Sequence, residues 1–370
     1  MRFRSVVIAL TLLAATAFAA PAPAWEEVVG LRFEERGDTR GLLLALDRQA
    51  AHLAKSPGTA VRIGNSRVTH RQLLHGVRTL QRLVMEYPDP TALSDQVNAH
   101  FRVYRTSHPE RAGKAHFTAY YDSVLEASPV RTGAFQYPLY ARPGDLAEKN
   151  GRSWRKVGEA LVPYHTRREI EEGGALAGRG LEIAWVADYV ELHYLHIQGS
   201  GRLHFPDGSV KTAHFSGTNG YPFQSAAKLM IDAGLTSGGY LAVKQWMREH
   251  LDVATPYFWR NSRFIFFRLS DEEPSGAAGI PLTPGRTIAT DKSIYPSGAI
   301  AFVRYSAPVI DDAGKVTSTV MTSRFVTDND TGVAIVGPGR ADLYVGTGAK
   351  AEMLAGATNT FGEMYYLIPR

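Results

Sequence analysis

The chain has 370 residues, of which 44% are hydrophobic and 21% charged, a balance that predicts a folded protein and excludes an intrinsically disordered one. Its length suits two domains better than one, because single hydrophobic cores stop growing near this size. The formal net charge of +5 is compatible with an anionic polymer but is no evidence for nucleic-acid binding, and the lack of cysteine excludes a thiol nucleophile and a cysteine-bound metal.

The first 24 residues have the features of a cleaved secretory signal. Arg2 and Arg4 precede an apolar run over residues 6–13, and small residues over 17–24 offer two cleavage points. The apolar run is shorter than the ~20 residues that cross a bilayer, and no later stretch is long enough. We therefore expect residues 1–24 to be removed and the mature chain to have no transmembrane segment.

Three helices are predicted at the start of the mature chain. Residues 41–55 carry leucines at mixed helical spacing, and residues 70–85 place their leucines and a valine on one face. Thr69 and Gln72 form a capping box ahead of the second helix. A shorter helix is predicted over 94–104.

From His116 the sequence changes to short runs rich in Tyr, Phe, Val and Thr. These runs predict strands and hairpins over 116–128, 160–165, 180–217 and 263–270, and again from 287 to the C-terminus. Two helices, over 223–233 and 240–250, interrupt them. The linker candidates, 128–133 and 270–279, predict an inserted domain over 128–270 between two outer segments, 25–127 and 271–370.

The triplet Asp330-Thr331-Gly332 matches one half of an aspartic protease site. Such proteases need two carboxyl groups that share a proton, each normally in its own triplet, and this chain has one. Two Ser-x-x-Lys matches, at 153–156 and 225–228, lack the companion motifs of penicillin-binding proteins and are better explained by chance. The glycine-rich stretches at 198–201 and 346–350 match neither a nucleophile elbow nor a phosphate loop.

His193 and His196 are three residues apart in a segment predicted to be a strand. Residues at that spacing point to opposite faces of a strand and cannot bind one ion together. We expect one histidine to be packed and the other exposed, and we predict neither a metal site nor a cofactor.

Asp342 is the strongest candidate for acid chemistry. It follows a Gly-Pro-Gly stretch and enters an apolar segment, where partial desolvation would raise the pKa of its carboxyl group and keep a proton available. Asp330 lies twelve positions earlier, and Asp291 is a further candidate neighbour. The alternative for each of the three is an aspartate that caps a turn.

Several long segments resemble one family. They are FTAYYDSVLEAS, GRGLEIAWVADYVELHYLHIQGSGRLHFPDGSVKTAHFSGTNGYPFQSAAKLMIDAG, ATDKSIYPSGAIAFV and DTGVAIVGPGRADLYVGTGAKAEMLAG. In this order they resemble the membrane-bound lytic murein transglycosylase A family, from about Phe117 to the C-terminus, and the last segment is similar to that family's three-aspartate domain. The resemblance implies a mainly β protein with a helical N-terminal part. The two ends of the chain would form a double-psi β-barrel, with a second β-barrel-like domain inserted and a groove between them.

The resemblance also implies a reaction and its residues. Asp342 would be the catalytic acid, with Asp330 as its companion and Asp291 as a further matching aspartate. The enzyme would cleave the β-1,4 bond between N-acetylmuramic acid and N-acetylglucosamine in peptidoglycan and leave a 1,6-anhydro end. The residues proposed to bind the sugar are Asp291, Tyr120, Tyr121, Gln198, Ser200, Asn219 and Tyr221. For the tyrosines the alternative is core packing, and for Gln198, Ser200 and Asn219 it is the ordering of a tight turn.

Members of this family are often lipoproteins anchored through a cysteine after the signal, and this chain has no cysteine. The resemblance therefore implies a periplasmic protein whose association with the outer membrane would need another means. Peptidoglycan strands are the expected partner, with other cell-wall enzymes as further candidates and no nucleic acid. Two other functions stay open: a murein-binding protein without activity, and a hydrolase in which Asp330 activates water beside Asp342.

Overall fold

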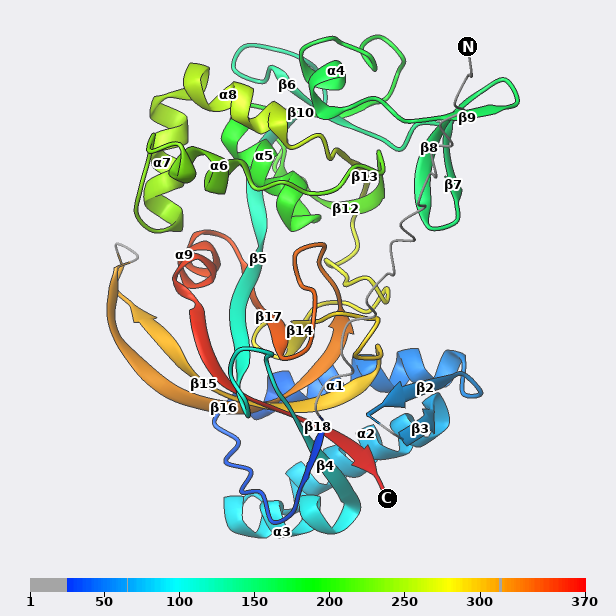
Figure 1. The fold of residues 1–370 in the computed structure, drawn as a ribbon, viewed down its shortest axis with the longest axis vertical. Helices are drawn as coiled ribbons and strands as arrows, with labels where there is room; N and C mark the ends of the chain where they lie inside the picture. Colours follow the sequence, from blue (N-terminus) through cyan, green and yellow to red (C-terminus); the bar gives the residue numbers. More distant parts are fainter. Residues whose placement is uncertain (1–24, 65, 313–314) are drawn as a thin grey trace, which may run out of the picture.

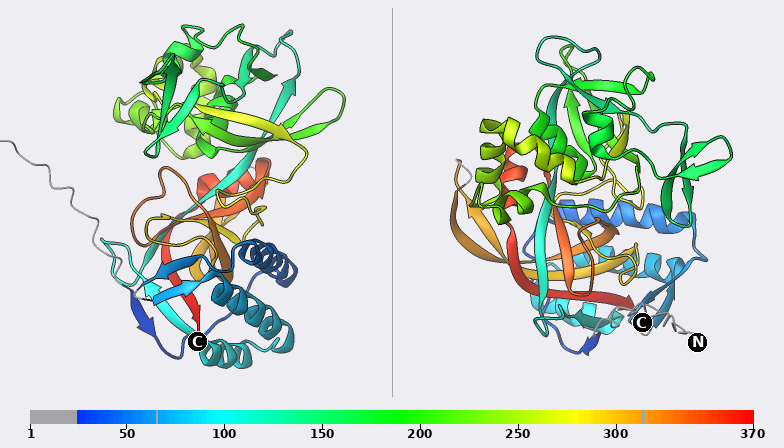
Figure 2. Two further views of the ribbon diagram at one scale, coloured as in Figure 1. Left: turned by 90° about the vertical axis from the view of Figure 1, so that its right-hand side faces the viewer. Right: turned by 45° about the horizontal axis from the view of Figure 1, so that its top comes forward.

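The computed structural model describes residues 25–64, 66–312 and 315–370. The chain forms two lobes, with the green and yellow-green segments in the upper lobe and both ends of the described chain in the lower one (Figure 1). Strand β5 runs from one lobe into the other, and the view turned by 90° shows the same two lobes (Figure 2). The predicted signal segment, residues 1–24, lies outside the described residues.

The helices, in chain order, are α1 (Thr39–Lys55), α2 (His70–Glu86), α3 (Pro90–His100), α4 (Arg167–Glu171), α5 (Tyr189–Gln198), α6 (Ala226–Asp232), α7 (Tyr240–Glu249), α8 (Leu251–Arg260) and α9 (Ala349–Ala357). The strands of the lower lobe are β1 (Glu26–Val28), β2 (Ala60–Ile63), β3 (Ser66–Thr69), β4 (Phe101–Thr106), β5 (Ala115–Ser128), β14 (Thr287–Ala289), β15 (Ala299–Ile310), β16 (Val316–Asp330), β17 (Arg340–Thr347) and β18 (Asn359–Pro369). The strands of the upper lobe are β6 (Tyr137–Tyr140), β7 (Leu146–Lys149), β8 (Arg152–Val157), β9 (Ala160–Val162), β10 (Glu182–Val186), β11 (Gly201–His204), β12 (Val210–Thr218) and β13 (Ile265–Ser270).

Six strands of the lower lobe pair in a closed ring. The order β18-β15-β16-β14-β17-β5 returns to β18 through pairing of Thr118 with Asn359 and of Ala115 with Gly362. Closing the ring provides hydrogen-bond partners for backbone groups that edge strands would otherwise leave unpaired. The lower lobe is therefore a small barrel built from both ends of the chain.

Strand β5 connects the barrel to the inserted lobe. Its first half pairs with β17 and β18 in the barrel, and its second half pairs with β11 and β10 above it. No chain break or linker separates the halves, so the two lobes share one continuous strand. The linker expected from residue 128 begins where β5 ends.

Three hydrophobic clusters follow this division. One lies within the barrel and against α1 to α3, with Leu46, Leu80 and Phe117 among its fully buried members. A second lies in the inserted lobe and includes Leu195 and Phe258, and a third, smaller cluster of the same lobe includes Phe266. Each lobe thus has its own core, as expected for two domains.

Most predicted elements are confirmed. The capping box forms as expected, since Thr69 accepts a hydrogen bond from the Gln72 amide while the Gln72 side chain accepts one from the Thr69 amide. The predicted helix over 240–250 is α7, and that over 223–233 is the shorter α6. The expected mainly β protein with a helical N-terminal part is the observed one.

Two local predictions are wrong. The helix expected over 94–104 ends at His100, because residues 101–106 pair as β4 with β1 and β18. Segment 189–198, expected to be a strand, is helix α5: the Asp188 side chain caps its start, and Gly199, at a φ of 84°, ends it in the left-handed region. Since α5 is buried on nearly every side, its sequence shows no amphipathic period.

The other errors are missed elements. Helices α4, α8 and α9 lie where the sequence suggested no helix, and α9 interrupts the run of strands expected up to the C-terminus. The short strands β1, β2, β3, β6, β7 and β8 were not predicted either. Within the residues that the structure describes, no helix is both long and apolar enough to span a bilayer.

Candidate active site

The two candidate catalytic aspartates flank one short strand of the barrel. On β14, Ala289 pairs with Asp330 of β16 on one side and with Asp342 of β17 on the other. Two strand spacings put the Cα atoms of the two aspartates roughly 10 Å apart. Aspartates twelve residues apart in sequence are thus neighbours across one strand.

Strand β5 adds three polar side chains beside them. Thr118, Tyr120 and Asp122 alternate along the strand and therefore share one face. In the register of β5 with β17, Thr118 lies opposite Asp342 and Tyr120 opposite Tyr344. These side chains meet at the end of the barrel nearest the inserted lobe.

Asp342 is half-buried, and its contacts fix the position of one carboxyl oxygen. The Thr118 hydroxyl donates a hydrogen bond to Oδ1 of Asp342, and Nη2 of Arg340 donates to Oγ1 of Thr118 at 2.7 Å. Burial raises the pKa of Asp342, and the nearby Asp330 adds to the rise, against the Thr118 hydrogen bond and the charge of Arg340. The carboxyl therefore holds a proton to a higher pH than an ordinary aspartate.

Asp330 is more deeply placed, with 8% of its surface exposed. Its Oδ1 accepts from the amides of Ala277 and Thr331, both at 2.8 Å, and its Oδ2 accepts from the Tyr120 hydroxyl at 2.6 Å. Burial raises the pKa of Asp330, while these three hydrogen bonds oppose the rise. Both oxygens are thus already bound to donors from the protein.

Tyr120 joins the acidic groups. Besides its bond to Asp330, its ring lies 5.3 Å from that of Tyr344 between ring centres. Burial raises the pKa of Tyr120, and the charges of Asp330, Asp342 and Asp122 raise it further. The tyrosine stays protonated and acts as a donor in the middle of three carboxyl groups.

Asp122 is a third carboxyl group at this site, and the sequence reasoning missed it. It accepts hydrogen bonds from the hydroxyls of Ser200 and Tyr344, both at 2.5 Å, and it is 1% exposed. Burial raises its pKa against these two hydrogen bonds. The signal available in the sequence was the alternation of Thr118, Tyr120 and Asp122 along a predicted strand.

Ser200 brings the inserted lobe to this cluster. It follows the last residue of α5 and the turn residue Gly199, and Gly201 pairs with Ser123 of β5. Gln198, also half-buried, lies two residues before Ser200. The segment 198–201 therefore lies where the two lobes meet beside the carboxyl groups.

Asp291 holds a loop. Its Oδ1 accepts from the amide and hydroxyl of Ser293, and its Oδ2 accepts from the Gly337 amide at 2.8 Å. Although burial raises its pKa, these hydrogen bonds outweigh it and the net shift is downward. Asp291 therefore ties the segment before Asp342 to the turn after β14, as a turn-capping aspartate does.

Tyr121 points away from the cluster, as the alternation along a strand requires. Its hydroxyl contacts that of Tyr240 and Oε1 of Glu352, both at 3.0 Å. Lys244, 1% exposed, forms ion pairs with both Glu352 and Glu191 beside it. Tyr121 thus belongs to a buried ionic network between α5, α7 and α9.

Asn219 and Tyr221 lie elsewhere on the inserted lobe. The Asn219 side chain is 1% exposed and makes hydrogen bonds with the backbone of His165, Ser262 and Phe264. The Tyr221 hydroxyl donates to the Tyr164 carbonyl at 3.0 Å. Asn219 therefore orders the turn, and among the described residues neither side chain contacts the acidic cluster.

The expectation for the two histidines needs correction. They lie on helix α5, and both are buried, whereas one had been expected to be exposed. His193 stacks on Phe258 with 4.2 Å between ring centres, and Nδ1 of His196 accepts from the Ile265 amide at 3.1 Å. Burial lowers the pKa of both well below the usual range, so both are neutral core residues.

Comparison with known proteins points to one family. The model of the MltA specific insert domain matches residues 116–268, and that of the 3D domain matches 286–368. The chain is 31% identical to membrane-bound lytic murein transglycosylase A of Escherichia coli K12 over 261 residues, and 31% identical to that of Vibrio cholerae over 265 residues. These matches cover 69% and 70% of this chain and 66% of each relative, so the chain spans about two thirds of their length.

Solved structures are similar over more of the chain. A membrane-bound lytic murein transglycosylase from Agrobacterium tumefaciens superposes with a TM-score of 0.76 at 30% identity, covering 94% of this chain and 98% of that one. Escherichia coli MltA with bound chitohexaose gives a TM-score of 0.69 at 25% identity, covering 88% and 89%. The expected double-psi β-barrel with an inserted domain is the fold of these proteins. The chain belongs to the membrane-bound lytic murein transglycosylase A family.

Proposed function

We propose that this chain is a lytic transglycosylase of peptidoglycan that uses Asp342 as its one catalytic acid and base. The observation that carries the proposal is the Asp342 carboxyl group itself: it is half-buried, its pKa is raised, and one of its oxygens is held by Thr118. A general acid must keep a proton near neutral pH and hold it in a fixed direction.

The hydrogen bonds around Thr118 decide which oxygen carries the proton. A guanidinium group can only donate, so the bond from Arg340 occupies a lone pair of the Thr118 hydroxyl. The hydroxyl proton is then directed to Oδ1 of Asp342, which acts as an acceptor. In the protonated acid the proton is therefore on Oδ2, the oxygen that would face the substrate.

In this reaction Asp342 acts twice, first as a general acid and then as a general base. Asp342 gives its proton to the glycosidic oxygen as the bond from N-acetylmuramic acid to N-acetylglucosamine breaks. The resulting carboxylate takes the proton of the C6 hydroxyl as that oxygen bonds to the anomeric carbon, which closes the 1,6-anhydro ring. Because the nucleophile belongs to the same sugar, its effective molarity can reach about 10^5 M or more.

Asp330 supports Asp342 electrostatically in this mechanism. A hydrolase would need a second carboxylate with a free oxygen that activates water. Since both oxygens of Asp330 already accept hydrogen bonds and the residue is 8% exposed, Asp330 is poorly arranged for that role. Its charge stabilises the positive charge that develops on the sugar ring.

Tyr120, Gln198 and Ser200 are the proposed sugar contacts beside the acid. All three are half-buried and lie where β5 and the end of α5 approach the carboxyl groups. Tyr121 and Asn219 stabilise the scaffold, and Asp291 holds the loop before Asp342. The partner is peptidoglycan, the proposed location is the periplasm, reached through the signal in residues 1–24, and other cell-wall enzymes are further candidate partners.

The test is replacement of Asp342 with Asn in the full chain. The variant should remain folded and release no 1,6-anhydromuropeptides from purified sacculi, a loss of at least about 10^2-fold. Mass spectrometry of the wild-type products separates the alternatives, because a hydrolase leaves ends heavier by one water. Normal turnover by the variant would refute the proposal, and binding of sacculi by the wild-type protein without release of fragments would identify a non-catalytic binder.

A further inference from the structure

A basic surface lies on the inserted lobe, away from the acidic cluster. Strands β7, β8 and β9 form a separate three-stranded sheet. Arg152, Trp154 and Lys156 alternate along β8 and share one side of it; Lys149 is paired with Arg152, and Leu161 with Lys156. We call this side of the sheet, with Lys149, Arg152, Trp154, Lys156 and Leu161, the basic face.

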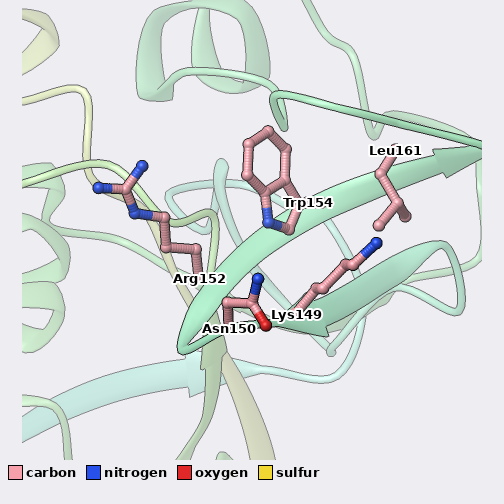
Figure 3. Close-up of a pocket in the computed structure, with 5 residues that line it drawn as sticks. All are labelled: Lys149, Asn150, Arg152, Trp154 and Leu161. Atoms are coloured by element: carbon pink, nitrogen blue, oxygen red, sulfur yellow. The ribbon is translucent and has the colours of Figure 1, made fainter.

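Four residues of the basic face, Lys149, Arg152, Trp154 and Leu161, line a cavity of about 440 Å³ together with Asn150 (Figure 3). A second cavity of about 580 Å³ shares Arg152 and Trp154 with it and continues across the lobe. The other residues that line the second cavity are Ser153, Pro163, Tyr164, Asn219, Gly220, Tyr221, Pro222 and Arg263. The two cavities therefore adjoin at Arg152 and Trp154, and aromatic side chains line them: Trp154 in both, with Tyr164 and Tyr221 in the second.

The positive charges of this surface have no acidic partners. Among the described residues, no ion pair engages Lys149, Arg152 or Lys156, and no hydrogen bond or ion pair engages the side chain of Arg263. Glu148, the one acid within these three strands, is on the opposite side of the sheet and pairs with Arg142 at 3.0 Å. Arg263 is also half-buried, and burial lowers its pKa.

A partly desolvated guanidinium without a counter-ion is costly, and an anionic ligand would remove the cost. Arginine binds carboxylates through two parallel hydrogen bonds, and an indole presents a flat apolar face to a sugar ring. Arg152 and Trp154 line both cavities, so a carboxylate-binding guanidinium and a sugar-binding indole occur in the same place.

We propose that the basic face and the cavity beside it bind a stretch of glycan strand that carries peptide stems, with the cations on the stem carboxylates and Trp154 against a sugar. The inference rests on the proposed function, which supplies the substrate class. Such a site would hold the polymer while its scissile bond lies at Asp342. It would increase affinity for the polymer and leave the chemical step unchanged.

The test compares charge-reversed variants in binding to purified sacculi. The full chain carrying Asp342→Asn serves as the background, so that the polymer is not consumed. Lys149→Glu with Arg152→Glu should weaken binding to intact sacculi about tenfold. The matched control, Arg71→Glu with Arg78→Glu on α2, changes the net charge equally and should leave the affinity unchanged.

Two further probes identify the ligand. Sacculi stripped of stems by an amidase should bind the charge-reversed variant and its parent equally, whereas Trp154→Ala should weaken binding to both kinds of sacculi. If the α2 control loses as much affinity for sacculi as the charge-reversed variant, the effect comes from net charge alone. If the charge-reversed variant loses as much affinity for stripped sacculi as for intact ones, the stem carboxylates are not the ligand. Either result overturns the proposal. A loss seen only with phosphatidylglycerol vesicles would make a membrane the ligand and also overturn it. Since binding requires no turnover, absence of anhydro products would refute the activity without deciding this test.

Discussion

Two adjacent tyrosines of β5 lie in opposite environments. Tyr120 faces Asp330, Asp342 and Asp122, whose carboxyl groups are held mainly by neutral hydroxyl and amide donors. Tyr121 faces the other way, toward carboxylates that are paired with a buried lysine. The strand thus separates an acidic cluster held mainly by neutral donors from a network in which Lys244 and Arg248 form ion pairs with the glutamates.

The contrast shows what makes a carboxyl group chemically useful. A cation in contact with a buried carboxyl group favours its charged form, whereas a carboxyl group held only by neutral donors lacks this compensation for burial. For Glu191, burial still outweighs Lys244 and Arg248, and its pKa is raised. Both faces contain acids, so the presence of acidic residues does not distinguish them. The arrangement of cations does.

The largest effect is expected on stability, from a substitution in the ionic network beside Tyr121. Replacing Lys244 with Met leaves the half-buried Glu352 without its cation and leaves Glu191 with Arg248 alone, which should lower the free energy of unfolding by about 3–5 kcal/mol. Urea unfolding at neutral pH measures the loss. The double variant Lys244→Met with Glu352→Gln should recover part of it, and unchanged stability of the single variant would show that the network contributes nothing.

A smaller effect is expected on catalysis, from a substitution in the acidic cluster beside Tyr120. Thr118→Val removes the donor to Oδ1 of Asp342 and should lower kcat about 10–100-fold, because a displaced acid transfers its proton poorly. Thr118→Ser, which retains the hydroxyl, should keep most of the activity. Loss of that hydrogen bond also raises the pKa of Asp342, so the alkaline limb of the rate profile should move to higher pH; a purely structural role for Thr118 would leave that limb in place.

The smallest effect concerns stability and pH. Since the pKa of Asp342 is raised in the folded state, its ionisation is unfavourable there, and stability falls as the pH rises above the unfolded value of about 4. Asp342→Asn should therefore be more stable than the parent at pH 7 by about 0.5–2 kcal/mol. The difference should disappear below pH ~4, where the aspartate is protonated in both states; thermal unfolding at the two pH values measures it, and a destabilised variant at pH 7 would contradict the raised pKa.

Local sequence patterns predicted helices α1 and α2, strand β5 and the two helices near 223–250. They failed for α5, whose burial on nearly every side hides the helical period, and therefore for its two histidines. The candidate site was predicted only in part: Asp342 and Asp330 were named, but Thr118, Arg340, Asp122 and Tyr344 were not. Their roles depend on the register of β5 with β17, which joins residues more than 200 positions apart.

The sequence by itself determined the alternation of residues along β5, the caps of its first helices and the family resemblance, because these are carried by residues close together in the chain. The tertiary structure decided which alternating face meets Asp342, which acids are neutralised by Lys244 and which cations remain unpaired on the inserted lobe. Each of these depends on the distance between side chains and on their removal from water, and neither is set until distant strands pair.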